Sequence, residues 1–139
     1  WERSASQLEA VLSKGGRSNL PPVADVVVHE QDIRGALGLP GNRDTSLIAL
    51  VTAPLAGVWE SKIDSAGLAP VVVKDGDRVM YGSPEAPVEM ATSRFEFFRA
   101  AYGRRSRSQI ERRFHGTDDP GAYVDLLCVF GPAGFDLVE

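Results

Sequence analysis

Asp25, His29 and Asp32 are the residues of this chain whose types and spacing are best suited to chemistry. On an α-helix each residue advances by about 100°, so the three side chains fall within one narrow stripe. Apolar residues border this stripe, with Val28 on one side and Val26, Ile33 and Leu37 on the other, whereas Glu30, Gln31 and Arg34 are expected to point the opposite way. We therefore expect the stripe to lie in the middle of the buried face. Unpaired charges are too costly to bury there, and an acid and a histidine four residues apart can reach one metal ion.

Two interpretations of these residues stay open at this point. Asp25 and His29 are either metal ligands or a buried structural pair, and zinc in proteins takes three or four protein ligands rather than two. His115 is not an obvious third ligand, because it is expected at the surface after Phe114. Asp32 either orients His29 through the other ring nitrogen or forms a salt bridge with an arginine on a neighbouring helix.

The densest basic run is Gly103-Arg104-Arg105-Ser106-Arg107, with further arginines at positions 94, 99, 112 and 113. An arginine here is suited to hold a carboxylate substrate through its forked geometry, and Arg104 is the best candidate because it lies between two predicted helices. The alternatives are phosphate binding and a solvated face at a helix C-terminus.

These residues are expected on a mixture of helices and strands. The spacing of apolar residues, together with the glycines and prolines that end helices, predicts three helices in the first half of the chain. They cover residues 1–14, from residues 19–22 to Gly38, and from Asp44 or Thr45 to Gly67, and Pro54 lies inside the third. After that the pattern changes to two strands around Asp75-Gly76, a hairpin signal, and a short third strand at 88–90. Capping boxes, in which Glu96 pairs with Ser93 and Gln109 with Ser106, then predict helices starting at Ser93 and Ser106, and Asp119-Pro120 predicts the start of a last helix. The fold class is therefore α+β, with a helical domain over 1–67 and a small α/β domain over 68–139.

Composition sets limits on the class of protein. The chain has 139 residues, 43% of them hydrophobic, with a net charge of −4, so it is not a generally nucleic-acid-binding composition. Its single cysteine, Cys128, allows no intrachain disulfide, which fits a reducing cytoplasm. No signal peptide or membrane span is visible. The chain starts at Trp1 without an initiator methionine and enters a helical pattern almost at once, so we expect a fragment that lacks an N-terminal segment.

Two segments carry a family resemblance. Residues 27–40, VVHEQDIRGALGLP, resemble the VVH-x-x-D-(I/V)-R-x-(A/P)-LG segment of the mycothiol-dependent maleylpyruvate isomerase family, an actinobacterial branch of the DinB/YfiT-like metal-binding proteins. Residues 93–106, SRFEFFRAAYGRRS, are similar to a segment in the C-terminal part of many members. The two motifs occur in the expected order, and the resemblance covers nearly the whole chain.

The resemblance implies an N-terminal helical bundle that binds a divalent metal, usually zinc, followed by a small α/β domain. Asp25 and His29 match the family's acid-x-x-x-His ligand pair, although the family often has glutamate at the first position. The histidine that members carry on an earlier helix has no match here, which agrees with missing N-terminal helices. The family's substrate-binding arginine corresponds best to Arg104, or else to Arg105. The thiol cosubstrate would be mycothiol.

We therefore expect a metal-dependent, mycothiol-linked isomerase or thiol S-transferase that acts on a small carboxylate. The alternatives are a catalytically inactive family member that serves as a binding or regulatory module and, as the weakest, nucleic-acid binding through the 104–113 basic run. The expected partners are the carboxylate substrate and either a missing N-terminal segment or a second copy of the chain; no membrane is expected.

Overall fold

The computed structural model describes residues 20–138, and the helix expected over residues 1–14 lies outside them. Within this part the chain forms five helices and a four-stranded sheet, which confirms the α+β class. The helices are α2 (Leu20–Ala36), α3 (Ser46–Ser65), α4 (Arg94–Ala101), α5 (Arg107–Glu111) and α6 (Pro120–Leu127). The strands are β1 (Val71–Asp75), β2 (Arg78–Tyr81), β3 (Val88–Ala91) and β4 (Phe114–His115).

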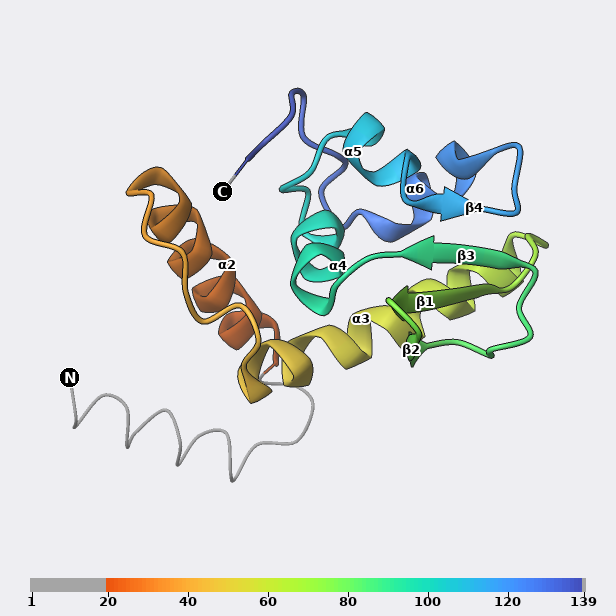
Figure 1. The fold of residues 1–139 in the computed structure, drawn as a ribbon, viewed down its shortest axis with the longest axis horizontal. Helices are drawn as coiled ribbons and strands as arrows, with labels where there is room; N and C mark the ends of the chain where they lie inside the picture. Colours follow the sequence, from red (N-terminus) through yellow and green to blue (C-terminus); the bar gives the residue numbers. More distant parts are fainter. Residues whose placement is uncertain (1–19, 139) are drawn as a thin grey trace.

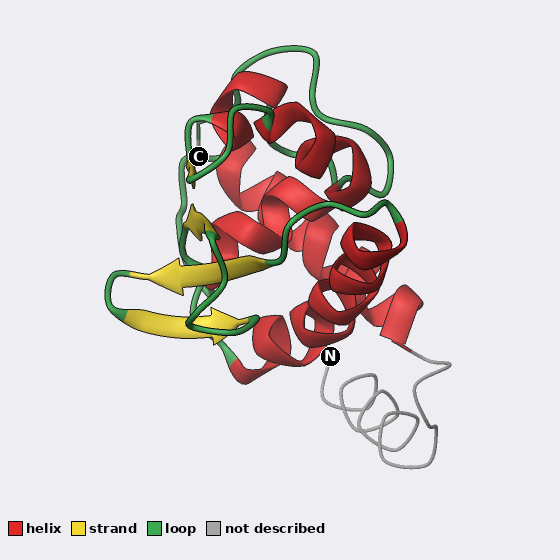
Figure 2. Cartoon of the chain, turned by 90° about the vertical axis from the view of Figure 1, so that its right-hand side faces the viewer, coloured by secondary structure: helices red, strands yellow, loops and turns green. Residues whose placement is uncertain are grey.

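The sheet has the order β2-β1-β3-β4. β1 pairs with β2 in the predicted hairpin and β3 pairs with β4, both antiparallel, whereas β1 and β3 run parallel. At the hairpin turn Gly76 has a φ of 57° while Asp75 and Asp77 have negative φ, so the turn is not the type I′ turn, which needs two residues with positive φ. In Figure 2 the strands gather on one side of the molecule, with the helices stacked beside and above them.

The predicted helix boundaries are mostly confirmed, because local capping chemistry sets them. The Thr45 hydroxyl accepts a hydrogen bond from the Ile48 amide at the start of α3, and Ser93 does the same for Glu96 at the start of α4. At α5 the reciprocal capping box of Ser106 and Gln109 is complete. α5 is shorter than expected, however, because Phe114 and the residue after it join the sheet as β4 rather than continuing a helix.

Two hydrophobic clusters hold these elements together. One joins α2 to the N-terminal half of α3 and to Phe95 and Phe98 of α4. The other lies around Trp59, whose indole N–H donates to the Tyr123 carbonyl at 3.1 Å, and it joins the C-terminal half of α3 to the sheet, α5 and α6. Since α3 and α4 contribute to both clusters, α2 is fixed relative to the rest of the molecule through these two helices (Figure 1). The division at residue 67 stays a prediction about folding units.

Of the helices within residues 20–138, only α3 has the length and composition to cross a membrane. Its buried apolar side chains pack in the two clusters just described. A single helix of this kind is weak evidence for a membrane protein.

Candidate functional site

Asp25 and His29 lie next to each other on an exposed face of α2. Their side chains are 71% and 60% exposed, and the carboxylate Oδ1 of Asp25 is 3.5 Å from Nε2 of His29. The other ring nitrogen, Nδ1, is 3.5 Å from Oδ2 of Asp32, whose side chain is 31% exposed. The imidazole therefore lies between two carboxylates. The expectation that this stripe is buried was wrong, and so was the alternative that Asp25 and His29 form a buried pair.

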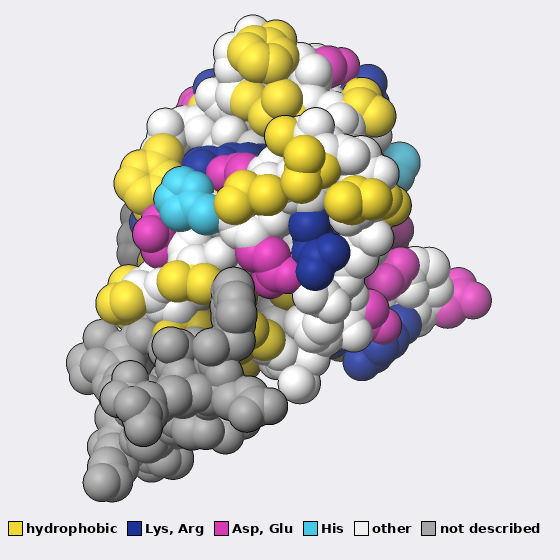
Figure 3. All heavy atoms as spheres, turned by 90° about the vertical axis from the view of Figure 1, so that its left-hand side faces the viewer, with side chains coloured by type: hydrophobic (Ala, Val, Ile, Leu, Met, Phe, Trp, Pro, Cys, Tyr) yellow, Lys and Arg dark blue, Asp and Glu magenta, His cyan; other side chains and the backbone are white. Residues whose placement is uncertain are grey.

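The reason is that α2 has apolar residues on more than one face. The face that packs against α3 and α4 carries Val23, Ala24, Val27, Val28 and Gln31. Gln31, expected to point outward, is 2% exposed, and its amide donates to the Gly41 carbonyl at 3.2 Å. Of the apolar neighbours of the stripe, Val28 is buried, whereas Val26, Ile33 and Leu37 are 60%, 61% and 65% exposed. Figure 3, which views the side where α2 lies in Figure 1, shows a histidine beside acidic side chains with hydrophobic side chains around them.

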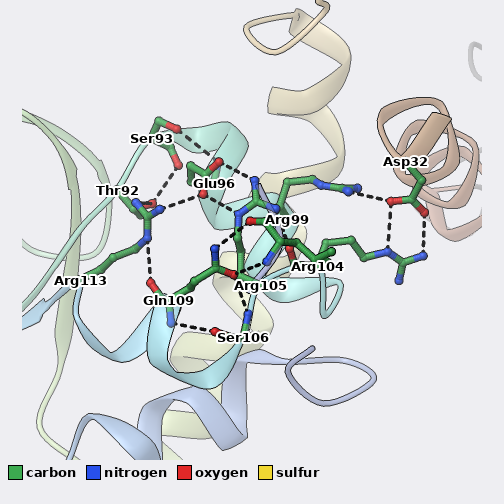
Figure 4. Close-up of polar contacts among 11 residues, drawn as sticks. Asp32, Thr92, Ser93, Glu96, Arg99, Arg104, Arg105, Ser106, Gln109 and Arg113 are labelled. Atoms are coloured by element: carbon green, nitrogen blue, oxygen red, sulfur yellow. Dashed lines mark hydrogen bonds and ion pairs between the residues drawn. The ribbon is translucent and has the colours of Figure 1, made fainter. Parts of the chain in front are cut away.

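Asp32 connects α2 to the second motif of the sequence. Its Oδ1 accepts from Nη2 of Arg99 at 2.7 Å and from Nε of Arg104 at 3.3 Å, and its Oδ2 accepts from Nη2 of Arg104 at 2.9 Å. Arg99 is 1% exposed and also donates to the Val28 carbonyl. Figure 4 shows both arginines extended from the α4 region toward Asp32. The salt bridge predicted for Asp32 is therefore present, whereas its role in orienting His29 stays a prediction, with Oδ2 of Asp32 3.5 Å from Nδ1 of His29.

Gly103 makes this approach of Arg104 possible. It has a φ of 71°, and a Cβ atom added to it would lie 2.4 Å from the Gly131 carbonyl oxygen. Only a glycine fits this combination of backbone angle and close contact. The chain therefore reverses directly after α4 and returns Arg104 to α2.

The charge state of Asp32 follows from these contacts. Burial by itself raises the pKa of its carboxyl, but the hydrogen bonds and charges of Arg104 and Arg99 outweigh burial and hold the pKa below its ordinary value. Asp32 is accordingly a carboxylate at neutral pH, which keeps a negative charge beside Nδ1 of His29.

A second ion-pair cluster lies around Glu96, on the first turn of α4. Arg105, with a side chain 4% exposed, donates through Nε and Nη2 to the two Glu96 oxygens at 2.8 and 2.7 Å. Arg113 donates to Glu96 at 2.9 Å and also bonds Thr92 and the Gln109 carbonyl. Figure 4 shows Glu96 between these two arginines. Of the two candidate substrate anchors, Arg105 is therefore buried against Glu96, whereas Arg104 is 26% exposed beside Asp32.

A cavity of about 460 Å³ adjoins Arg104. Asp32, Arg99 and Gly103 line it together with Gly35 and Ala36 of α2 and two residues of the C-terminal segment, Leu137 and Val138. The bonds of Arg104 to Asp32 and to the Tyr102 carbonyl use three N–H groups, and a guanidinium has five. Among residues 20–138, two N–H groups of Arg104 are therefore without a hydrogen-bond partner.

The C-terminal wall of this cavity is fixed by Gln109. Its side-chain amide donates to the Leu137 carbonyl at 2.8 Å, and its oxygen accepts from the Leu137 amide at 3.1 Å. The next residue back, Asp136, accepts hydrogen bonds from the hydroxyls of Ser106 and Ser108. The short segment after α5 and α6 is thus held against the second motif.

The basic run itself is largely neutralised by acids. In addition to the pairs of Arg104, Arg105 and Arg113, Arg107 pairs with Asp125 and Glu111, and Arg112 lies 3.5 Å from Asp136. Residues 104–113 therefore do not present the row of unpaired cations that binding to a phosphate backbone requires.

Within residues 20–138, no group of three or more histidine, cysteine, aspartate and glutamate side chains is arranged to hold a metal. Asp25 and His29 supply two donors, and Asp32 is engaged with the two arginines. His115 is exposed on β4, as expected, and does not join them.

Arg99 and Glu96 are the important residues that the sequence reasoning did not single out. The sequence predicts Glu96 only as the capping-box partner of Ser93, whereas its carboxylate binds Arg105 and Arg113. For Arg99 a signal was present, since it stands in the otherwise apolar run Phe97-Phe98-Arg99-Ala100-Ala101. A charge inside such a helix face requires a buried partner.

Comparison of the chain with protein-family models, with curated proteins and with solved structures found no match.

Proposed function

We propose that this chain carries the metal-binding and carboxylate-anchoring residues of a metal-dependent thiol enzyme, a mycothiol-linked isomerase or S-transferase acting on a small carboxylate in the cytoplasm. In this proposal α2 and α3 belong to a DinB-like helical bundle. The observation that carries it is the arrangement of Asp25, His29 and Asp32 along one exposed stripe of α2.

The donor spacing fits a zinc ion. Zinc lies about 2.0–2.2 Å from nitrogen and carboxylate ligands, so two ligands at a tetrahedral angle are roughly 3.4 Å apart. The separation between Asp25 Oδ1 and His29 Nε2 is 3.5 Å. Both donors are exposed and reachable without unfolding α2. A third protein ligand has to come from outside residues 20–138 or from a second copy of the chain.

The environment of His29 supports the same proposal. Metal-binding histidines commonly direct their second nitrogen toward a carboxylate, which fixes the ring orientation and raises the basicity of the ligand. Asp32 is suited to this role because it is ionised and because Arg99 and Arg104 hold it in place.

In this proposal the substrate is held by a side chain of the chain, whereas the thiol comes from a cosubstrate. Arg104 lines the cavity, has two N–H groups without a partner among residues 20–138, and would hold the substrate carboxylate. Cys128 is unsuited as the nucleophile, because burial raises the pKa of its thiol to about 11. A cosubstrate therefore has to supply the thiol. A bound zinc ion would favour its thiolate form.

The test is zinc binding by two histidine variants. We expect the chain to bind Zn²⁺ in isothermal titration calorimetry, and His29→Ala to weaken the affinity at least tenfold because it removes one of two described donors. His115→Ala is the matched control, since the second histidine of the chain is exposed on β4, and it should leave the affinity unchanged.

Two outcomes contradict the proposal. If His29→Ala and His115→Ala bind zinc equally well, the ion is held elsewhere. If the wild-type chain binds no zinc, the alternative function is favoured, a catalytically inactive binding or regulatory module in which Asp32, Arg99 and Arg104 serve only to join the helices.

A further inference from the structure

A cavity of about 340 Å³ lies between the segment before α3, the β1–β2 hairpin and the start of α4. Three arginines line it, Arg43, Arg78 and Arg94, and none of Asp25, His29 and Asp32 does. It is therefore separate from the proposed metal and substrate site.

Two of these arginines have buried nitrogens without a partner. Within residues 20–138, no acceptor is hydrogen-bonded to the Nε of Arg43 or of Arg94, although both atoms are shielded from water. Leaving a buried donor unsatisfied destabilises the folded state, and more strongly so for a charged group. Two of the arginines that line this one cavity thus each keep a buried donor without an acceptor among the described residues, which calls for an explanation.

The charges around the cavity favour an anion. Glu96 also lines it, but its carboxylate is already bound by Arg105 and Arg113. Asp44 is 97% exposed and lies 3.7 Å from Arg94, and Asp75 is exposed at the hairpin turn. Three guanidinium groups thus face two exposed carboxylates, which leaves an excess of one positive charge.

Phe95 and Met80 form the apolar part of the lining, and Ser93 also contributes to it. The guanidinium carbon of Arg43 lies over the Phe95 ring, 4.8 Å from its centre, and Met80 contributes a flexible thioether. One excess positive charge next to an aromatic wall matches a monoanion with an apolar body. We infer that this cavity binds a small organic carboxylate, with Arg43 and Arg94 holding the carboxylate and Phe95 and Met80 contacting its apolar part.

The test uses benzoate as the probe and the NMR signals of the arginine Nε–H groups as the readout. We expect benzoate to shift the Nε–H signals of Arg43 and Arg94 in a saturable manner and to leave that of Arg112, which is 61% exposed and lies outside the cavity, unchanged. Benzylamine, with the opposite charge on a similar body, should cause no shift, and inorganic phosphate should bind more weakly than benzoate because it lacks the apolar part.

Variants complete the test. Arg43→Gln and Arg94→Gln should each weaken benzoate binding at least tenfold, whereas the matched variant Arg112→Gln should not. Arg43→Gln keeps the inference testable if Arg94→Gln, at the first position of α4, does not fold. The inference is overturned if benzoate shifts no signal, if Arg112→Gln weakens binding equally, or if the shifts appear at Arg99 and Arg104, which would assign the carboxylate to the other cavity.

Discussion

Replacing Glu96 by glutamine is expected to lower the free energy of unfolding by about 3–5 kcal/mol at pH 7, because breaking a buried ion pair leaves an uncompensated buried charge. Glutamine has nearly the same size and one carbonyl oxygen, but it has no charge to offset Arg105, whose side chain is 4% exposed, or Arg113. Urea denaturation followed by circular dichroism measures the change.

Glu111→Gln is the matched control for this substitution. Glu111 pairs with Arg107 at 3.5 Å on the surface of α5, and surface pairs of this kind contribute about 0.2–1 kcal/mol. If the two variants lose similar amounts of stability, the Glu96 cluster does not hold the structure together in the way we describe.

The same cluster predicts how stability depends on pH. Burial alone raises the pKa of Glu96, but the hydrogen bond from Arg105 and the charges of Arg105, Arg113 and Arg43 outweigh burial, and the pKa lies below its ordinary value. Because the pKa of Glu96 is lower in the folded than in the unfolded protein, its ionised carboxylate stabilises the fold above the unfolded-state pKa of about 4.3. This stabilisation is lost as the pH falls through the folded-state pKa. Wild-type stability should therefore fall steadily below about pH 4.3, and Glu96→Gln should show a shallower decline. An equally steep decline in both proteins would contradict this assignment.

Replacing Arg99 by methionine should destabilise the protein by about 2–4 kcal/mol, slightly less than Glu96→Gln because Asp32 keeps Arg104 as a partner. Methionine fills most of the volume of the buried side chain but cannot donate to Asp32 or to the Val28 carbonyl. Since these bonds join α4 to α2, the loss should be accompanied by faster amide hydrogen exchange in α2 than in the strands.

Arg107→Met provides the comparison for Arg99→Met, because Arg107 is 44% exposed and pairs with Asp125 and Glu111 on the surface. We expect it to cost less than about 1 kcal/mol. A double-mutant cycle of Arg99→Met with Asp32→Asn then isolates the interaction between the two helices. A coupling energy near zero would show that Arg99 acts through packing alone.

Local chemistry determined much of this fold in advance. Thr45, Ser93 and Ser106 cap the helices that they were expected to start, and the Asp75-Gly76 signal marks the hairpin between β1 and β2. These features depend on a hydroxyl that accepts from an amide three residues further along, or on a glycine with positive φ, so neighbouring residues are sufficient to specify them. The closeness of Asp25 and His29 is of the same kind, since four residues of helix bring them together.

Tertiary packing alone decided which face of α2 is buried. Valines occur around the helix, so the spacing of apolar residues did not choose between the face with Val27 and the face with Ile33. The contact of α2 with α3 and α4 made that choice and left Asp25 and His29 exposed. Packing also determined which charged side chains pair. Asp32 binds Arg99 and Arg104, which lie some seventy residues away in the sequence. Glu96, expected only as a capping partner, binds Arg105 and Arg113. A buried charge requires a partner of opposite sign, but the sequence does not state which one the fold will bring within reach.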